Sequence, residues 1–207
     1  MPIDMATLYA QYPALARVES HNDHRLPART PVVRRLPRGG VGAEIGVFTG
    51  VFSEFLIEQT APREFYLVDA WDVGGASAWE PPPDAPWSAY VDHGNLTYEA
   101  ARCAARARAG GHPVITARSV DWLASRPDHS LDWVYLDTTH RYGDTMKELA
   151  ALSRVVRPDG IIAGDDAWED DPNPDMGVLR AIRDFTRTHP WEIFYLDDGQ
   201  FTLRTDR

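Results

Sequence analysis

Three acidic residues follow two apolar runs in the second half of the chain, where strands of a sheet would end. Asp137 comes after LDWVYL, and Asp165 and Asp166 come after IIAG. If the two runs are neighbouring parallel strands, the carboxylates meet at one sheet edge and repel one another unless a positive group lies among them. Mg²⁺ or Ca²⁺, a hard cation with oxygen ligands, would supply that charge, so we expect a metal site here. The alternative is that one or two of these acids cap helix N-termini.

His140 lies three residues after Asp137, just past the same apolar run. A single histidine is more often structural or solvated. Beside a metal-bound hydroxyl, however, its neutral ring could accept a proton, since imidazole has an ordinary pKa of ~6.5. Arginines are too basic for this role, and Lys147 is the only lysine of the chain. We therefore expect His140 to be the general base with an apparent pKa near ~6–7, and Asp137 or a metal-bound hydroxide to be the alternative.

A glycine turn in the first half of the chain could hold a ligand. The sequence from Glu44 to Gly50 has the pattern E-x-G-x-x-x-G and joins an apolar run to a segment with helical spacing. Its glycines allow a tight turn, and the following helix would offer free N–H groups to an anion such as a carboxylate. Asp69 ends the next apolar run, where an acid can accept hydrogen bonds from both hydroxyls of a ribose. A plain turn at the glycines and a capping role for Asp69 are the alternatives.

The elements that must position these residues alternate between strand and helix. Strands are predicted at 41–48, 64–71, 113–119, 130–140, 161–168, 191–196 and 200–204. Helices are predicted at 5–17, 49–60, 97–111, 120–127, 144–156 and 176–189, the fifth of them stopping at the PDG of residues 158–160. This alternation predicts an α/β fold with a doubly wound parallel sheet and helices on both faces, to which the final hairpin adds one antiparallel strand.

The chain is long enough for one domain with a small appendage, at 207 residues and 23.2 kDa. Residues 1–40 contain five prolines and predict a loop-rich arm. The five arginines of residues 21–40 belong either to a solvated surface or to a flap over a site. Residues 41–207 form the main domain. Residues 72–98 interrupt it with a segment rich in proline and tryptophan, and Trp79 and Trp87 are expected either to line a lid or to pack on the surface.

The composition excludes several classes of protein. A formal net charge of −10 argues against a general nucleic-acid binder. The single cysteine, Cys103, excludes an internal disulfide framework, and no apolar run approaches the ~18 residues of a membrane span. The N-terminus has no basic region followed by an apolar core. We therefore expect a cytoplasmic protein that acts on a small molecule and binds neither nucleic acid nor membrane, with homodimer formation left open.

Taken in order, these segments resemble class I S-adenosylmethionine-dependent methyltransferases. AEIGVFTGVFSEFL resembles the first motif of that superfamily, YLVDAW the second, and the stretch from DWVYLDTTH to IIAGDDAW the fourth and fifth. The later GVLRAIRDF and the terminal hairpin also fit, so the resemblance extends from Val41 to Arg204. It implies a Rossmann-like sheet of seven strands. The chain resembles in particular the small methyltransferases related to macrocin and mycinamicin O-methyltransferases, and more distantly catechol O-methyltransferase.

The resemblance implies a cofactor site. Glu44 and the Gly46–Gly50 turn would hold the methionine part of S-adenosylmethionine, Asp69 would bind the ribose, and Ser119 would border the adenine. Ser53 would replace the serine that many relatives have at the preceding position. The full set expected to contact the cofactor is Glu44, Gly46, Val47, Phe48, Thr49, Gly50, Ser53, Asp69, Ala70, Trp71, Ser119 and Asp137.

The resemblance also covers the acidic cluster. Asp137, Asp165 and Asp166 fall where metal-dependent members bind their metal, and His140 falls where the catechol enzymes carry a lysine base. We therefore expect an O-methyltransferase of secondary metabolism that acts, with the help of Mg²⁺, on a hydroxyl of a natural product, a sugar or a catechol-like phenol. The alternatives are a metal-independent methyltransferase, a metal-dependent hydroxylase-like enzyme on the same fold, and a cofactor-binding protein without turnover.

Overall fold

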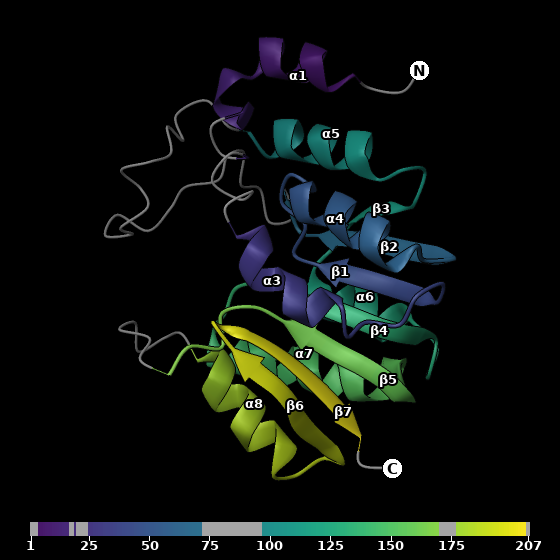
Figure 1. Ribbon diagram of the computed structural model, residues 1–207, viewed down its shortest axis with the longest axis vertical. Coiled ribbons are helices and arrows are strands. Elements are labelled where there is room, and N and C mark those ends of the chain that lie inside the picture. The colour runs from purple at the N-terminus through teal and green to yellow at the C-terminus, as the bar shows by residue number, and fades with distance from the viewer. Residues whose placement is uncertain (1–3, 17–18, 20–24, 72–96, 170–176, 206–207) are drawn as a thin grey trace.

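A sheet of seven strands forms the centre of the computed structural model, which describes residues 4–16, 19, 25–71, 97–169 and 177–205 (Figure 1). The strands are β1 (Val41–Ile45), β2 (Glu64–Asp69), β3 (Val114–Thr116), β4 (Leu131–Leu136), β5 (Val156–Gly164), β6 (Trp191–Asp197) and β7 (Gln200–Thr205). The helices are α1 (Met5–Gln11), α3 (Leu26–Val33), α4 (Val51–Thr60), α5 (Tyr98–Arg108), α6 (Ser119–Ser125), α7 (Tyr142–Val155) and α8 (Val178–Thr186).

The strand order is β3-β2-β1-β4-β5-β7-β6. Neighbours from β3 to β5 pair in parallel, whereas β7 runs antiparallel to both β5 and β6. This confirms the predicted fold class, including the antiparallel strand of the terminal hairpin. The winding of the chain changes direction between β1 and β4, and in open α/β sheets ligands bind beyond the carboxyl ends of the strands at such a switch point.

Helices cover both faces of the sheet because its central strands are apolar on both sides (Figure 1). Trp133 and Tyr135 of β4 pack in the core that includes residues of α3, α4 and α5. Val134 and Leu136 pack in the core that includes residues of α6, α7 and α8. All four side chains are buried, as expected for a parallel strand covered on both faces, and each contributes ~1.5–3 kcal/mol. The carboxyl end of β4 is therefore held firmly in place.

The N-terminal arm is more regular than the sequence predicts. Residues 26–33 form α3, which contacts β7 and α4. Pro27 lies in its first turn, where a missing N–H costs no hydrogen bond. Val32, Val33 and Leu36 are buried in the core shared with α4. The expectation of an irregular arm is wrong here, because the packing of three apolar side chains outweighs the low helix propensity of two prolines.

The helix expected at residues 5–17 is interrupted. α1 ends at Gln11, since Tyr12 precedes Pro13 and the residue before a proline is disfavoured in the α conformation. Helical structure resumes at residues 13–16. The buried side chains of Leu8 and Leu15 pack against the alanine face of α5, so the start of the chain is attached to the main fold.

The predicted strands run too far at their carboxyl ends. β1, β2, β4 and β5 end at Ile45, Asp69, Leu136 and Gly164, so the residues that follow lie in loops above the sheet edge. At its other end, β5 begins at Val156 and includes the PDG predicted to lie before it. Most of the insertion expected at residues 72–98, including Trp79 and Trp87, lies outside the described residues. Its last two residues, Thr97 and Tyr98, cap and begin α5. Within the described part of the chain, no helix is both long and apolar enough to cross a lipid bilayer.

Candidate active site

The glycine turn after β1 is locked against the end of β4. Gly46 has a φ of 93°, and a Cβ atom at this position would lie 1.7 Å from the carbonyl oxygen of Asp137. The N–H of Gly46 donates to the carbonyl of Val68 (2.8 Å), and the N–H of Asp137 donates to that of Ile45 (2.8 Å). Only glycine fits this conformation at this distance, so the turn and the acidic strand end occupy fixed relative positions.

The start of α4 offers unused hydrogen-bonding groups. Gly50, the N-cap residue, has a φ of 80° and provides no side chain to cap the first turn. Thr49, next to it, is fully buried, and its Oγ1 has no hydrogen-bond partner in the described part of the chain. An anionic ligand group at this helix N-terminus would satisfy both the backbone N–H groups and the threonine hydroxyl.

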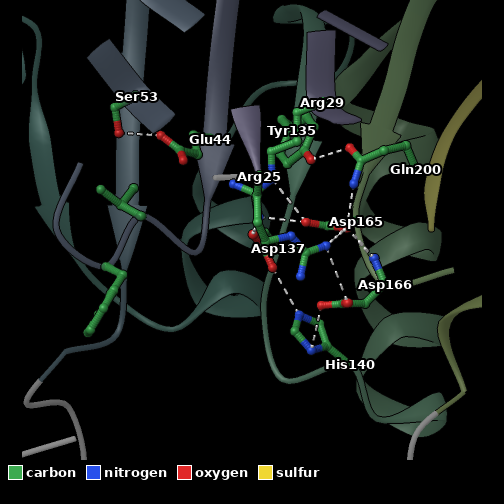
Figure 2. Close-up of polar contacts among 12 residues, drawn as sticks. Arg25, Arg29, Glu44, Ser53, Tyr135, Asp137, His140, Asp165, Asp166 and Gln200 are labelled. Atoms are coloured by element: carbon green, nitrogen blue, oxygen red, sulfur yellow. Dashed lines mark hydrogen bonds and ion pairs between the residues drawn. The ribbon is translucent and has the colours of Figure 1, made fainter. Parts of the chain in front are cut away.

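Glu44 is buried near this turn at the end of β1 (Figure 2). Ser53 of α4 donates a hydrogen bond to its carboxyl group. Burial raises the pKa of Glu44 to about 8, so the carboxyl is largely protonated at neutral pH. A cationic ligand group nearby would favour the ionised form instead, which makes Glu44 a suitable partner for an ammonium group.

Asp69 at the end of β2 holds the glycine turn in shape. Its Oδ2 accepts hydrogen bonds from the N–H groups of Val47 and Phe48, both at 2.8 Å, and its Oδ1 accepts one from Trp71 at 2.9 Å. The indole of Trp71 in turn donates to the carbonyl of Phe48 (2.9 Å). Asp69 and the following Ala70 are half-buried. The carboxylate is therefore placed beside the turn, where the sequence expects the ribose.

Ser119 begins α6 near the same sheet edge. Its hydroxyl donates to Oε1 of Glu148 (2.5 Å), and Thr138 after β4 donates to Oε2 (2.9 Å). Glu148 is a buried acid on α7 that the sequence analysis did not single out, and burial raises its pKa. Through these two hydrogen bonds it joins the loops after β3 and β4, where the sequence predicts the border of the adenine.

Two arginines of the N-terminal arm lie among the three aspartates (Figure 2). Arg29 contacts Asp137 Oδ2 at 2.7 Å and Asp165 Oδ2 at 2.5 Å through Nη2. Arg25 contacts Asp165 Oδ1 at 2.9 Å. Burial and the neighbouring Asp137 raise the pKa of Asp165, while the two guanidinium groups favour its ionised form. The sequence analysis left open whether the arginines of this arm are solvated or cover a site, and it did not assign Arg25 or Arg29 to the acidic cluster.

His140 lies between two carboxylates. Its Nε2 is 3.0 Å from Asp137 Oδ1, and its Nδ1 is 3.2 Å from Asp166 Oδ2. A ring nitrogen that presented a lone pair to a carboxylate would be repelled, so these contacts favour the doubly protonated ring. The carboxylates raise the pKa of His140 to about 9 against the opposing effect of burial, rather than leaving it near the expected 6–7. His140 and Asp166 both have a left-handed backbone, with φ of 59° each.

Tyr135 and Gln200 complete this network. The hydroxyl of Tyr135 donates to Gln200 Oε1 (2.6 Å), and Gln200 Nε2 donates to Asp165. The guanidinium of Arg29 lies over the ring of Phe52, 4.5 Å from its centroid. Local sequence patterns do not predict these contacts, because the partners lie in three separate elements: α4, β4 and the start of β7.

A known sequence family matches the chain. The family is described as a methyltransferase domain, and the match covers residues 43–167, from β1 to the loop after β5. The chain belongs to this methyltransferase family. Its glycine turn, Asp69 and the acidic cluster all lie within the matched segment.

Solved structures support the same assignment of fold. A SAM-dependent methyltransferase from Aquifex aeolicus is 16% identical, with a TM-score of 0.54 over 86% of this chain and 90% of that one. A protein from Pyrococcus horikoshii is 15% identical, with a TM-score of 0.58 over 89% and 91%. A protein from Galdieria sulphuraria, named for a proposed sarcosine dimethylglycine methyltransferase activity, is 15% identical with a TM-score of 0.54. The match covers 85% of this chain but only 63% of the Galdieria protein. No curated protein sequence matches significantly.

S-adenosylmethionine is the donor that the sequence predicts for this methyltransferase, and the turn fits it. The open N-terminus of α4 and the unpartnered Thr49 hydroxyl suit its carboxylate, the buried Glu44 suits its ammonium, and Asp69 lies where hydroxyl groups of a ribose could bind. These matches are of charge and hydrogen-bonding capacity. The contact of each individual residue with the cofactor stays a prediction.

The divalent metal fits less well. Single ligand atoms of Asp137, His140 and Asp166 do lie within 4.8 Å of one another. However, each of the six oxygens of Asp137, Asp165 and Asp166 already has a protein nitrogen within 3.2 Å. A metal ion would have to displace His140 from its carboxylates, and an arginine as well if it bound all three acids. The arrangement of the cluster therefore does not fit Mg²⁺.

Proposed function

We propose that this methyltransferase transfers the methyl group of S-adenosylmethionine to a hydroxyl group of a small molecule, without a divalent metal. The observation that carries the proposal is the place of His140, which lies between Asp137 and Asp166. The backbone of Asp137 in turn lies against Gly46 of the glycine turn. A strong base at this place suits an acceptor that must lose a proton, as a hydroxyl does. Of the alternatives that the sequence left open, this is the metal-independent methyltransferase.

S-adenosylmethionine, when bound, supplies an electrophilic methyl group on a sulfonium. The acceptor oxygen would take up this methyl group, S-adenosylhomocysteine would leave, and the hydroxyl proton would move to Nδ1 of His140. For this, Nδ1 must first give its own proton to solvent, and the acceptor hydroxyl must take the place of the Asp166 carboxylate beside it. Asp137 then stabilises the imidazolium that forms, as the structure holds it. In this proposal the protein positions the acceptor, provides His140 as the base, and provides Asp137 as the charge that stabilises the imidazolium.

The properties of His140 favour a phenolic acceptor. A general base works best when its pKa is close to that of the group it deprotonates and to the working pH. The pKa of His140 is raised to about 9, while a phenol has an ordinary value of ~10. An aliphatic alcohol is far less acidic and would need additional help. This supports the catechol-like phenol among the acceptors expected from the sequence.

Trp168 offers a surface on which a planar acceptor could stack. Its side chain is a large apolar group that is exposed, with 41% of its surface accessible. The indole N–H donates to Asp166 Oδ1 (3.0 Å), and the ring packs against Gly199, where a Cβ would lie 2.5 Å from it. An immobilised aromatic ring two residues from Asp166 would suit an aromatic or sugar-like acceptor.

Calorimetry with S-adenosylhomocysteine and an activity assay test the proposal. The wild-type protein should bind S-adenosylhomocysteine. With S-adenosylmethionine and a catechol or simple phenol, it should also form S-adenosylhomocysteine as a product in the presence of EDTA. Sugars, amines and thiols serve as comparison acceptors. A protein that binds no S-adenosylhomocysteine at millimolar concentration, or that methylates amines but no hydroxyl compound, would refute the proposal.

A further inference from the structure

We infer that Arg29 occupies the place of a divalent metal ion in the acidic cluster and acts as a positioning residue for Asp137 and, through it, for His140. The first part concerns the positive charge that balances the three carboxylates, and it does not depend on the identity of the methyl acceptor. The second part rests on the proposed function, since it assumes that His140 takes part in the reaction.

The guanidinium group is built into the cluster rather than lying on its surface. Only 11% of the Arg29 side chain is exposed. One of its nitrogens, Nη2, bridges Asp137 and Asp165, and Nε adds a further hydrogen bond to Asp165 at 3.0 Å. Its Cζ lies over the Phe52 ring. Figure 2 shows Arg29 among the carboxylates. Bridging two carboxylates from neighbouring strands is what a metal ion would do at this position.

The charges of the cluster balance without a metal. Three carboxylates, those of Asp137, Asp165 and Asp166, face two guanidinium groups and one imidazolium. A buried group of like charges is stable only with such compensation. A Mg²⁺ ion added to this set would bring two uncompensated charges, so we expect the wild-type cluster to have little affinity for it.

Arg29 also determines the orientation of the Asp137 carboxylate. Asp137 Oδ2 faces Arg29, and Oδ1 faces His140 Nε2. Because α3 is anchored by buried Val32 and Val33, the guanidinium is a fixed point from which the carboxylate and then the imidazole are aligned. Removing Arg29 would free one end of Asp137 and loosen the alignment of His140.

Binding of Mn²⁺, a paramagnetic substitute for Mg²⁺, tests the first part in the absence of cofactor and acceptor. Wild-type protein, Arg29→Met and Arg34→Met are titrated with Mn²⁺ and followed by electron paramagnetic resonance. Arg34 is an exposed residue at the C-terminal end of the same helix and serves as the matched control. We expect a new Mn²⁺ site only in Arg29→Met, at least tenfold tighter than any binding by the other two. Equally tight binding by the wild type at the cluster would overturn the inference, as would an absence of binding in folded Arg29→Met.

The His140 ring signals in ¹H–¹⁵N spectra test the second part. In wild type and Arg34→Met, both ring N–H protons should be visible at neutral pH because each faces a carboxylate. In Arg29→Met the Nε2–H signal should shift or disappear through exchange with water. Unchanged ring signals would show that Arg29 does not position this pair.

Arg29→Lys keeps the test decisive if Arg29→Met does not fold. Lysine retains the charge but not the planar group that reaches both carboxylates. We expect it to bind no Mn²⁺ while still disturbing the Nε2–H signal; a wild-type signal in this variant would refute the positioning role. The Mn²⁺ experiment and the activity assay can fail independently. Even if the protein transfers no methyl group to a hydroxyl, Arg29→Met can still gain a Mn²⁺ site or fail to gain one.

Discussion

His140 is the residue whose neighbours change its chemistry most. Sequence spacing placed it near Asp137 and so identified the candidate base, but it could not show that Asp166, from the next strand of the sheet, faces the other ring nitrogen. Because two carboxylates rather than one face the ring, the pKa of His140 is about 9 and not near the expected 6–7. Local spacing predicts a partner within one loop, whereas it carries no information on contacts across the sheet.

The titration of His140 follows from this arrangement. Its pKa in the folded protein is about 9, above the ~6.5 of an unfolded chain, so the protonated ring stabilises the fold. This contribution is fully present below pH ~6.5 and is lost as the pH rises through about 9. We expect an NMR titration of the His140 ring to show a midpoint near 9, with His140→Gln providing the assignment. The stability of His140→Gln should vary less than that of wild type between these two pH values. A midpoint at or below 6.5 would contradict the two-sided ion pair.

Asp69 provides a second prediction for a single residue. Asp69→Asn should weaken the binding of S-adenosylhomocysteine by ~10–100-fold, because a charge-assisted hydrogen bond to a hydroxyl is worth ~1.5–3 kcal/mol. The protein should stay folded, since an amide oxygen can still accept from the N–H groups of the glycine turn. Calorimetry measures the affinity, and Asp159→Asn, on an exposed residue of β5, is the control. A change of less than twofold would show that Asp69 serves only to shape the turn.

Among the elements, the strands were predictable and α3 was not. Apolar runs located all seven strands, and the acids at their ends located the cluster, because both signals are local. The arginines that complete the cluster lie at the start of α3 and within it. This helix was not predicted, because its two prolines indicate irregular structure. Arg29 meets Asp165 across 136 residues of sequence, and such a contact leaves no local pattern. The approximate place of the site could therefore be predicted, whereas the cation within it could not.

The attachment of the N-terminal segment to α5 can be tested through one ion pair. Arg108 contacts both oxygens of the buried Glu19 at 2.9 Å, and Tyr9 donates to Glu19 at 2.6 Å. Arg108→Met should lower the free energy of unfolding by about 3–5 kcal/mol, because it leaves a carboxylate in a site built for an ion pair. Urea denaturation measures this, and the exposed Arg106→Met should change it by less than about 0.5 kcal/mol.

A second substitution separates the charge from the packing. Adding Glu19→Gln to Arg108→Met should recover most of the lost stability, since the uncompensated charge is then gone. If the double variant is no more stable than Arg108→Met, the aliphatic part of the arginine, rather than its charge, holds the segment.

At the scale of the whole molecule, the domain boundary expected at residue 40 divides one core. Val32, Val33 and Leu36 are buried with side chains of α4, β2 and β4. We therefore expect residues 41–207 alone to lack a cooperative thermal transition, and residues 25–207 to retain one, as measured by circular dichroism. A transition of residues 41–207 within a few degrees of the full chain would instead support an independent domain and a separable arm.

The position of β7 between β5 and β6 has a consequence for biosynthesis. The chain leaves the ribosome from its N-terminus, so α3 emerges before the sheet, and Gln200, which donates to Asp165, emerges after the other six strands. Until then β5 is an edge strand with unpaired backbone groups, a form in which chains associate with one another. A nascent chain that has not yet formed β7 thus carries the glycine turn and His140, but lacks the contact that completes the surroundings of Asp165. Methyl transfer should accordingly begin only after β7 has been synthesised and has paired with β5.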